Sequence, residues 1–239
     1  MSDEFFVSEM VKDYGPVVAV DGIDLSIEPG IVHCIAGPNG SGKSTLLGVM
    51  LGLIRPTDGT VVRPASDRIG AGFQEPAFYD SLTVKENLDV FRTLAGDPDF
   101  EWVKEIVEVF NLSQVFHRQA SELSGGYSKQ LDLTLALLKS PDFLLLDEPL
   151  ADLDDVTRES LLDFLEEYAA EGNAVVVSSH RIDAFAPTLD RLTVMHEGEI
   201  VLDGRREEID GTERIKRVYR NAIAENGESA DRGERGGDR

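Results

Sequence analysis

The residues most clearly suited to chemistry form one short stretch, GPNGSGKST, which begins at Gly37. It satisfies the phosphate-loop pattern G-x-x-x-x-G-K-S/T, in which glycines let the backbone turn its N–H groups toward phosphate oxygens. Lys43 would place a positive charge near the β- and γ-phosphates, and the Ser44 hydroxyl would bind Mg²⁺. The stretch therefore predicts a nucleotide site made of Gly37, Pro38, Asn39, Gly40, Ser41, Gly42, Lys43, Ser44 and Thr45.

A phosphate loop needs a strand before it and a helix after it, because the helix N-terminus completes the anion site. Residues 31–36 form an apolar run suited to a buried strand, and residues 44–53 have the apolar spacing of a helix. The single cysteine, Cys34, lies in the apolar run, where we expect a buried packing role rather than a reactive thiol. Both flanks agree with the nucleotide-site prediction.

A second candidate group is a pair of carboxylates at the end of another apolar run. Residues 143–146 (FLLL) are typical of a central parallel strand, and Asp147 and Glu148 follow directly. Open α/β sheets bind ligands at the carboxyl ends of their strands. Asp147 is therefore a candidate Mg²⁺ ligand, and Glu148 a candidate to orient or deprotonate an attacking water.

Three further side chains are placed at strand ends. Gln74 follows the predicted strand 68–73, where it either reaches the bound phosphate and metal or is a plain surface glutamine. His180 follows the predicted strand 174–178, and we favour a contact with the γ-phosphate over a purely structural role. Tyr14 precedes a Gly-Pro pair and either packs half-buried or offers its ring to a nucleotide base.

A second anion-friendly stretch is LSGGYSKQ at residues 123–130, directly before a predicted helix. Ser124, Gly125 and Gly126 would present free N–H groups at the positive end of the helix dipole. One nucleotide does not need two phosphate cradles from the same chain. We therefore expect a second copy of the chain to present this stretch to the nucleotide of the first.

The elements expected around these residues predict an α/β fold, with a phosphate-loop core of mostly parallel sheet. Short alternating bursts at residues 5–28 predict an N-terminal antiparallel β-subdomain. Residues 78–140 predict a helical insertion, in which Ser81 or Thr83 caps a helix. The pattern then predicts a hairpin over 191–203 and a final helical segment over 205–223. One domain therefore spans 1–223, and a disordered acidic and polar tail follows at 224–239.

Composition narrows the class of protein. The 239 residues can bury a sizeable core, and no apolar run approaches the roughly 20 residues needed to cross a bilayer. The net charge of −22, from 23 basic and 45 acidic residues, argues against nucleic acid as a partner. Such a surface resembles those of proteins from a high-salt cytoplasm, the alternative being an ordinary acidic protein. The acidic N-terminus lacks signal-peptide order, which predicts a cytoplasmic protein.

Over roughly residues 5–210, the chain resembles the ATP-binding subunit of ABC transporters. The motifs of that family occur in its order: the adenine-stacking aromatic Tyr14, the phosphate loop 37–45, the Q-loop Gln74, the signature 123–126, the Walker B strand 143–148, the D-loop 151–154 and the switch histidine His180. The signature LSGG directly ahead of a helix is the most specific of them. The base-reading NKxD motif of GTPases is absent from the sequence, which favours ATP.

Three residues depart from the family's pattern. Tyr127 stands where glutamine is frequent after LSGG, and related subfamilies with other residues there remain active. In the D-loop, Asp152 replaces a small residue and Asp155 replaces a frequent proline. These last two concern the dimer contact that the loop makes in the family.

The resemblance implies that two copies, as a homodimer or heterodimer, sandwich two ATP molecules head to tail. Lys43 and Ser44 of one copy and the signature of the other would hold the same triphosphate. The residues implied are Glu148, His180 and Lys43 for catalysis, Ser44, Gln74 and Asp147 for Mg²⁺, and Ser124, Gly125 and Gly126 of the partner copy as the signature. The implied activity is ATP hydrolysis that drives solute transport through a separate membrane subunit.

The resemblance also implies a docking place for that subunit. In the family, the segment after Gln74 lines a groove that receives a coupling helix from an integral membrane permease; here it contains Phe78, Tyr79 and Leu82. The chain would then lie on the inner face of the cell membrane through its partner. The alternative that stays open is a soluble non-transport family member, which is less favoured because a coiled-coil insertion and a second ATPase half are both missing. The acidic surface also argues against DNA or ribosome binding.

Overall fold

The computed structural model describes residues 4–209 and 212–234. The chain divides into two compact units. The first contains Glu28–Val32 and Pro64–Val177, and the second contains Glu4–Ile27, His33–Arg63 and Ser178–Arg239.

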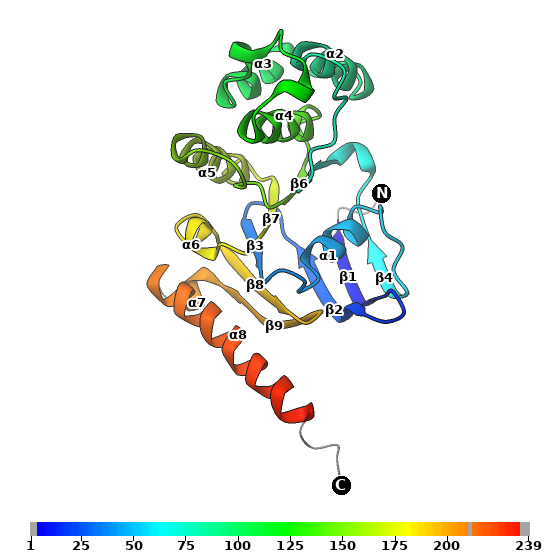
Figure 1. The fold of residues 1–239 in the computed structure, drawn as a ribbon, viewed down its shortest axis with the longest axis vertical. Coiled ribbons are helices and arrows are strands. Elements are labelled where there is room, and N and C mark those ends of the chain that lie inside the picture. Colours follow the sequence, from blue (N-terminus) through cyan, green and yellow to red (C-terminus); the bar gives the residue numbers. More distant parts are fainter. Residues whose placement is uncertain (1–3, 210–211, 235–239) are drawn as a thin grey trace. The chain divides into compact units, whose positions relative to one another are not determined.

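The second unit contains a small antiparallel sheet with the strand order β2-β1-β4 (Figure 1). Its strands are β1 (Phe5–Asp13), β2 (Val18–Ile27) and β4 (Asp58–Val62). Phe5 and Val7 alternate with less buried residues along β1, as expected for a strand that packs one face on a core. The alternation breaks at Glu9, which has a φ of 47° at a bulge. The predicted N-terminal antiparallel subdomain is confirmed.

The second unit also contains the strand order β3-β8-β9. These strands are β3 (Val32–Ala36), β8 (Arg191–His196) and β9 (Glu199–Arg205), with β8 parallel to β3 and antiparallel to β9. Every residue of β3 is buried, including Cys34, as the apolar run predicts. The helices are α1 (Lys43–Met50), α6 (Ile182–Phe185), α7 (Arg206–Ile209) and α8 (Thr212–Glu234). Helix α8 continues past residue 223, the predicted end of the final helical segment, and so covers part of the predicted tail at 224–239. Residues 235–239 lie outside the described part of the chain.

The first unit combines a set of strands, of which β5 and β6 are parallel, with the whole of the predicted helical insertion at 78–140. Its strands are β5 (Ile69–Gly72), β6 (Phe143–Asp147) and β7 (Ala174–Ser179), in the order β5-β6-β7. Its α-helices are α2 (Val84–Leu94), α3 (Phe100–Val109), α4 (Gly125–Leu137) and α5 (Asp155–Ala170). Short 3-10 helices cover Ser66–Arg68, Leu112–Val115 and Ala120–Glu122. Helix α4 packs against both α2 and α3 (Figure 1). The α/β class is confirmed.

Side-chain caps fix where the helices of the first unit begin. Thr83 and Glu86 form a reciprocal capping box at α2, which confirms Thr83 as one of the two predicted caps. Asp99 accepts hydrogen bonds from the backbone at the start of α3, and Asp154 does the same at α5. Ser124 caps α4, so the helix begins inside the LSGG motif.

An aromatic cluster holds α3 against α4 and α5. The Trp102 ring stacks on Tyr168 at 5.9 Å between centroids, and Tyr168 stacks on Phe164 at 5.5 Å. Trp102 Nε1 donates to the Leu137 carbonyl at 2.8 Å, close to the C-terminal end of α4. The apolar face of α3, with Ile106 and Val107 buried, is therefore core. Within residues 4–209 and 212–234, none of the helices combines the length and apolarity that a membrane span requires.

Candidate nucleotide site

The phosphate loop connects β3 to α1 in the second unit, and its glycines are sterically required. Gly40 and Gly42 have φ values of 82° and 100°, a backbone conformation that L side chains rarely adopt. A Cβ on Gly37 would collide with the Met195 carbonyl oxygen and with the Ser41 side chain. A side chain is therefore excluded by collision at Gly37 and disfavoured by backbone conformation at Gly40 and Gly42.

Two polar side chains complete the cradle. Lys43 is only 6% exposed, and its Nζ donates to the carbonyl oxygens of Gly37 at 2.8 Å and Pro38 at 3.0 Å. The ammonium therefore folds back over the loop. The buried Ser41 hydroxyl has no hydrogen-bond partner among the described residues. Because an unsatisfied buried hydroxyl is costly, a phosphate oxygen bound in the loop would stabilise it. The residues present thus fit a nucleoside triphosphate.

The residue before His180 is hydrogen-bonded to the phosphate loop. The Gly37 N–H donates to the Ser179 carbonyl oxygen at 3.3 Å, which joins the first residue of the loop to the residue before His180. Ser179 Oγ accepts a hydrogen bond from the Arg181 N–H at 3.0 Å, so the turn after β7 is fixed on both sides of the histidine. The His180 side chain itself is exposed.

Tyr14 is partly exposed, so its ring is accessible, and both half-buried packing and stacking on a base remain open. The residue is 53% exposed, and Lys12 Nζ lies 4.7 Å from the ring centroid. The turn is held by a hydrogen bond from the Tyr14 N–H to the Val17 carbonyl at 3.0 Å. An exposed ring on a fixed turn is suited to stacking on a flat ligand.

In the first unit, Asp147 ends β6 and Glu148 follows it. Leu144, Leu145 and Leu146 are buried, whereas Asp147 and Glu148 are partly exposed. Glu148 has a φ of 48°, which is uncommon for a residue with a side chain and is found at constrained functional positions. The carboxylates therefore emerge at the carboxyl end of the strand, as the apolar run predicts.

The signature stretch forms the N-terminus of α4. Ser124 and Gly125 are exposed, and Ser124 Oγ accepts a hydrogen bond from the Tyr127 N–H at 3.4 Å. Asp152, which has a φ of 60°, packs against the glycines. A Cβ on Gly125 would lie 3.2 Å from Asp152 Cβ, and one on Gly126 would lie 3.1 Å from the Asp152 carbonyl oxygen. The glycines accommodate the D-loop of the same unit and leave the helix N-terminus accessible.

Two residues of α4 that the sequence analysis missed contact the segment before Gln74. Lys129 Nζ donates to the Phe73 carbonyl oxygen at 2.5 Å, and the Phe73 N–H donates to Asp132 Oδ2 at 2.9 Å. Gln74 itself is exposed. The available signal was the presence of two charged residues, three positions apart, in the otherwise apolar helix KQLDLTLALL.

The electrostatics of this pair follow from burial. Burial lowers the pKa of Lys129, and the nearby carboxylates, including Asp132 and Asp147, oppose that effect. Burial also raises the pKa of Asp132 to about 6, against the opposing effects of its backbone hydrogen bonds and of Lys129. Both groups are therefore held in a poorly solvated place by specific contacts.

No cluster of three or more His, Cys, Asp or Glu side chains suited to a metal ion occurs in residues 4–209 and 212–234. The predicted Mg²⁺ set of Ser44, Gln74 and Asp147 supplies one hydroxyl, one amide and one carboxylate. Mg²⁺ is commonly bound through one or two carboxylates and completes its shell with phosphate oxygens and water. The predicted set is of that kind.

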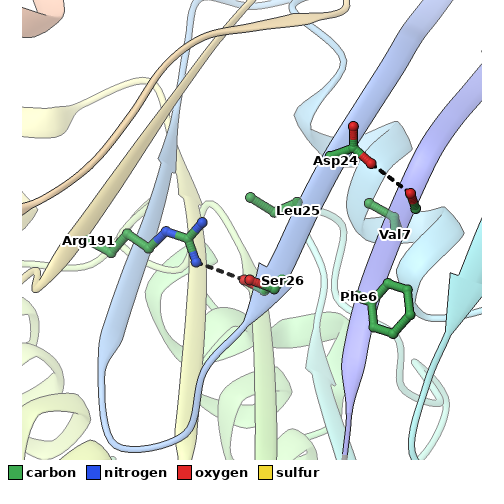
Figure 2. Close-up of a pocket in the computed structure, with 7 residues that line it drawn as sticks. Phe6, Val7, Asp24, Leu25, Ser26 and Arg191 are labelled. Atoms are coloured by element: carbon green, nitrogen blue, oxygen red, sulfur yellow. Dashed lines mark hydrogen bonds between the residues drawn. The ribbon is translucent and has the colours of Figure 1, made fainter.

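A shallow pocket of about 290 Å³ lies on β1 and β2 of the second unit, beside Arg191 (Figure 2). Arg191 Nη1 donates to the Ser26 carbonyl at 2.9 Å, and its Nε and Nη2 donate to the Asp203 carboxylate at 3.0 and 2.6 Å. Ser8 Oγ donates to Asp24 at 2.7 Å. The polar groups on its wall are thus engaged with one another, and the pocket is separate from the predicted nucleotide-binding residues.

A larger groove of about 370 Å³ lies in the helical part of the first unit. It is lined by Lys85, Leu88, Asp89, Arg92, Phe100, Val103, Lys104, Val107, Glu108, Ser113 and Phe116. The predicted docking residues Phe78, Tyr79 and Leu82 are not among these lining residues. Tyr79 is 52% exposed, and its ring lies 5.9 Å from that of Phe91 on α2. The predicted docking residues therefore lie in the segment that precedes α2 and do not line this groove.

The phosphate loop between a buried parallel strand and a helix, with acidic residues at the end of β6, defines a phosphate-loop nucleotide hydrolase. The chain belongs to the ATP-binding subunits of ABC transporters, because the family model described as "ABC transporter" matches residues 20–151. Its activity is ATP hydrolysis that drives transport through a separate membrane subunit.

Individual relatives agree with this assignment. The chain is 27% identical to the lantibiotic transport ATP-binding protein SrtF of Streptococcus pyogenes, over 91% of this chain and 96% of that protein. It is 32% identical to the bacitracin transport ATP-binding protein BcrA of Enterococcus faecalis, over 87% of this chain and 70% of that protein. A dimeric structure of a bacterial ABC transporter cassette superposes with a TM-score of 0.75 at 26% identity, covering 84% of this chain and 98% of that one.

These comparisons confirm the general predictions about nucleotide binding, dimerisation and a membrane partner. Nucleotide binding, dimerisation and a membrane partner belong to the family, so the soluble non-transport alternative is not favoured. The roles of individual site residues, the metal and the docking surface remain predictions.

Proposed function

We propose that the chain hydrolyses Mg²⁺-ATP in a composite site, in which the phosphate loop of one copy faces the signature of a second copy. The observation that carries this proposal is the presence of two phosphate-binding elements in one chain. The loop at Gly37 contains the buried Ser41 hydroxyl, which lacks a partner among the described residues, and the N-terminus of α4 has exposed Ser124 and Gly125. A single triphosphate needs both only when they come from different copies.

In the site, the loop N–H groups and Lys43 would hold the β- and γ-phosphates, and Tyr14 would stack on the base. Ser44, Gln74 and Asp147 would hold Mg²⁺, which supplies charge neutralisation between the phosphates. Glu148 would orient the attacking water and accept its proton, and His180 would contact the γ-phosphate. Ser124, Gly125 and Gly126 of the other copy would donate to the γ-phosphate from the positive end of their helix.

Mixing two inactive variants tests the composite site. Lys43→Met disables the phosphate loop, whereas Ser124→Asp keeps a good helix cap but repels a triphosphate. Each homodimer should lose ATP hydrolysis. An equimolar mixture should regain roughly a quarter of wild-type activity, since half of randomly paired dimers contain one intact site of two. A mixture that stays as inactive as its components would refute the arrangement. Ser121→Asp, which adds the same charge at a nearby exposed serine, is the matched control.

We propose further that a membrane permease docks on the surface made by Phe78, Tyr79 and Leu82 at the start of α2. This proposal is supported by the exposure of Tyr79 and by the rigid turn that presents it. The Tyr79 N–H donates to Asn87 Oδ1 at 2.8 Å, and Asn87 Nδ2 donates back to the Tyr79 carbonyl at 3.0 Å. Docking there would place the chain on the cytoplasmic face of the membrane, connected to the site through Gln74.

A further inference from the structure

Helix α4 contains two charged side chains where an apolar helix would suffice. Lys129 and Asp132 are each 3% exposed, and their neighbours Leu131 and Leu133 are core residues. Buried charges are costly unless they are paired and hydrogen-bonded. The hydrogen bonds that Lys129 and Asp132 make therefore show which parts of the chain these buried charges hold in place.

Their main contact is the backbone on either side of Gln74. Lys129 Nζ donates to the Phe73 carbonyl oxygen at 2.5 Å, and the Phe73 N–H donates to Asp132 Oδ2 at 2.9 Å. The other carboxylate oxygen, Asp132 Oδ1, accepts from the Ala77 N–H at 3.2 Å. Both polar backbone groups of Phe73 and the N–H of Ala77 are thus held by one helix, so the exposed segment between them is fixed at both ends.

Lys129 also reaches the end of β6. Its Nζ lies 3.5 Å from the Asp147 carbonyl oxygen, which accepts a second hydrogen bond. The carboxylates of Asp147, Glu148 and Asp152 stabilise the ammonium electrostatically. The Lys129 side chain therefore contacts both the segment before Gln74 and Asp147, the last residue of β6.

We propose that Lys129 and Asp132 are positioning residues for ATP hydrolysis, which connect α4, the helix that begins at the signature motif, to the backbone at Gln74 and Asp147. The inference rests on the metal-binding roles proposed above for Gln74 and Asp147. When Ser124 meets the nucleotide of the partner copy, any displacement of α4 is transmitted through these hydrogen bonds to Gln74 in the same chain. The pair thus links closure of one composite site to the arrangement of the other.

The test uses full-length chains with Mg²⁺-ATP and compares Lys129→Met and Asp132→Asn with the wild type. Lys129→Met removes the donor at similar length, and Asp132→Asn replaces one acceptor oxygen by an amide donor that faces an N–H group. We expect kcat to fall on the order of 10- to 100-fold, because small misplacements of a positioned group are that costly. The Kd for ATP without metal should change by no more than about twofold, because the phosphate loop is unaltered. Lys139→Met and Asp163→Asn remove exposed charges of the same types and should retain wild-type kinetics.

A double-mutant cycle with Gln74→Ala separates positioning from general destabilisation. If Lys129 and Asp132 act through Gln74, adding either variant to Gln74→Ala should lower kcat by less than about threefold more. Losses that multiply fully would refute the proposal, as would variants whose Kd for ATP rises in parallel with the loss of kcat. If Lys129→Met does not fold, the Asp132→Asn cycle decides alone, since that substitution preserves side-chain shape.

The same cycle distinguishes this inference from the proposed function. A Gln74→Ala chain that hydrolyses ATP at the wild-type rate would refute the role of Gln74, and this inference with it. A slow Gln74→Ala chain with fully multiplicative second variants would refute the positioning role of Lys129 and Asp132 alone.

Discussion

The geometry of the phosphate loop predicts different costs for three glycine-to-alanine substitutions. Gly40 has a φ of 82°, and a Cβ there would meet no other part of the described chain within 4 Å, so Gly40→Ala tests backbone conformation alone. Gly42 has a φ of 100°, and its Cβ would collide with the Ala19 carbonyl oxygen and approach Met195 Cε to 3.3 Å. Gly37 has no positive φ, but its Cβ would collide with the Met195 carbonyl oxygen. The three positions therefore separate strain from collision.

The magnitudes follow from these differences. A left-handed conformation costs an L residue about 1–2 kcal/mol, which is the expected cost of Gly40→Ala. Forcing a methyl group against fixed backbone adds about 1–3 kcal/mol, so Gly42→Ala should cost about 2–5 kcal/mol. For a chain of this size, each kcal/mol lowers Tm by about 2–4 °C. Gly40→Ala should thus lower Tm by about 2–8 °C, and Gly42→Ala by about twice as much.

Calorimetry of the nucleotide-free chains measures these shifts directly. Gly37→Ala should cost at least as much as the difference between Gly42→Ala and Gly40→Ala, because its Cβ collides with a carbonyl oxygen and also with the Ser41 side chain. Equal Tm values for Gly40→Ala and Gly42→Ala would show that the collision with Ala19 does not exist. The reasoning from the loop geometry would then be refuted.

Three further predictions concern the first unit. Trp102→Phe removes the donor to the Leu137 carbonyl, so the free energy of unfolding in urea should fall by about 1–3 kcal/mol, and a change near zero would contradict a stabilising role for this hydrogen bond. Asp132 has a pKa of about 6 when folded against its usual 3.8, so its contribution to stability is present below pH 3.8 and is lost as pH rises through 6. The stability of the wild type relative to Asp132→Asn should therefore fall by up to about 3 kcal/mol (about two pKa units at ~1.4 kcal/mol each) between about pH 3.5 and 7, and a pH-independent difference would contradict this. Tyr79→Asp should lower the fraction of chain that sediments with permease-containing vesicles without changing the Kd for ATP, and a parallel loss of both would count against the docking surface.

The parts of the site that the sequence predicts are those encoded locally. The phosphate loop, the carboxylates after β6 and the signature before α4 each depend on a strand or helix that adjoins them, so spacing alone locates them. The structure confirms the strand or helix that flanks each motif. Gly40 and Gly42 illustrate why: their positive φ values are a property of the loop itself.

The parts that the sequence does not predict depend on contacts between distant residues. Lys129 and Asp132 meet Phe73 across 56 and 59 positions, and no local pattern reports such a pairing. The environment of Tyr14 was ambiguous for the same reason, because its exposure depends on what the rest of the fold leaves uncovered. The extent of α8 differs from the expected helix end because polar composition alone does not fix where a helix stops.

The mass of Glu148→Gln in solution shows whether two copies of the chain close around ATP. This substitution removes the carboxylate proposed to activate water while leaving the phosphate loop and the signature unaltered. The chain should be a monomer without nucleotide and a dimer with Mg²⁺-ATP in high-salt buffer, because bound ATP is no longer turned over. A Glu148→Gln chain that binds ATP and remains a monomer would contradict the composite site.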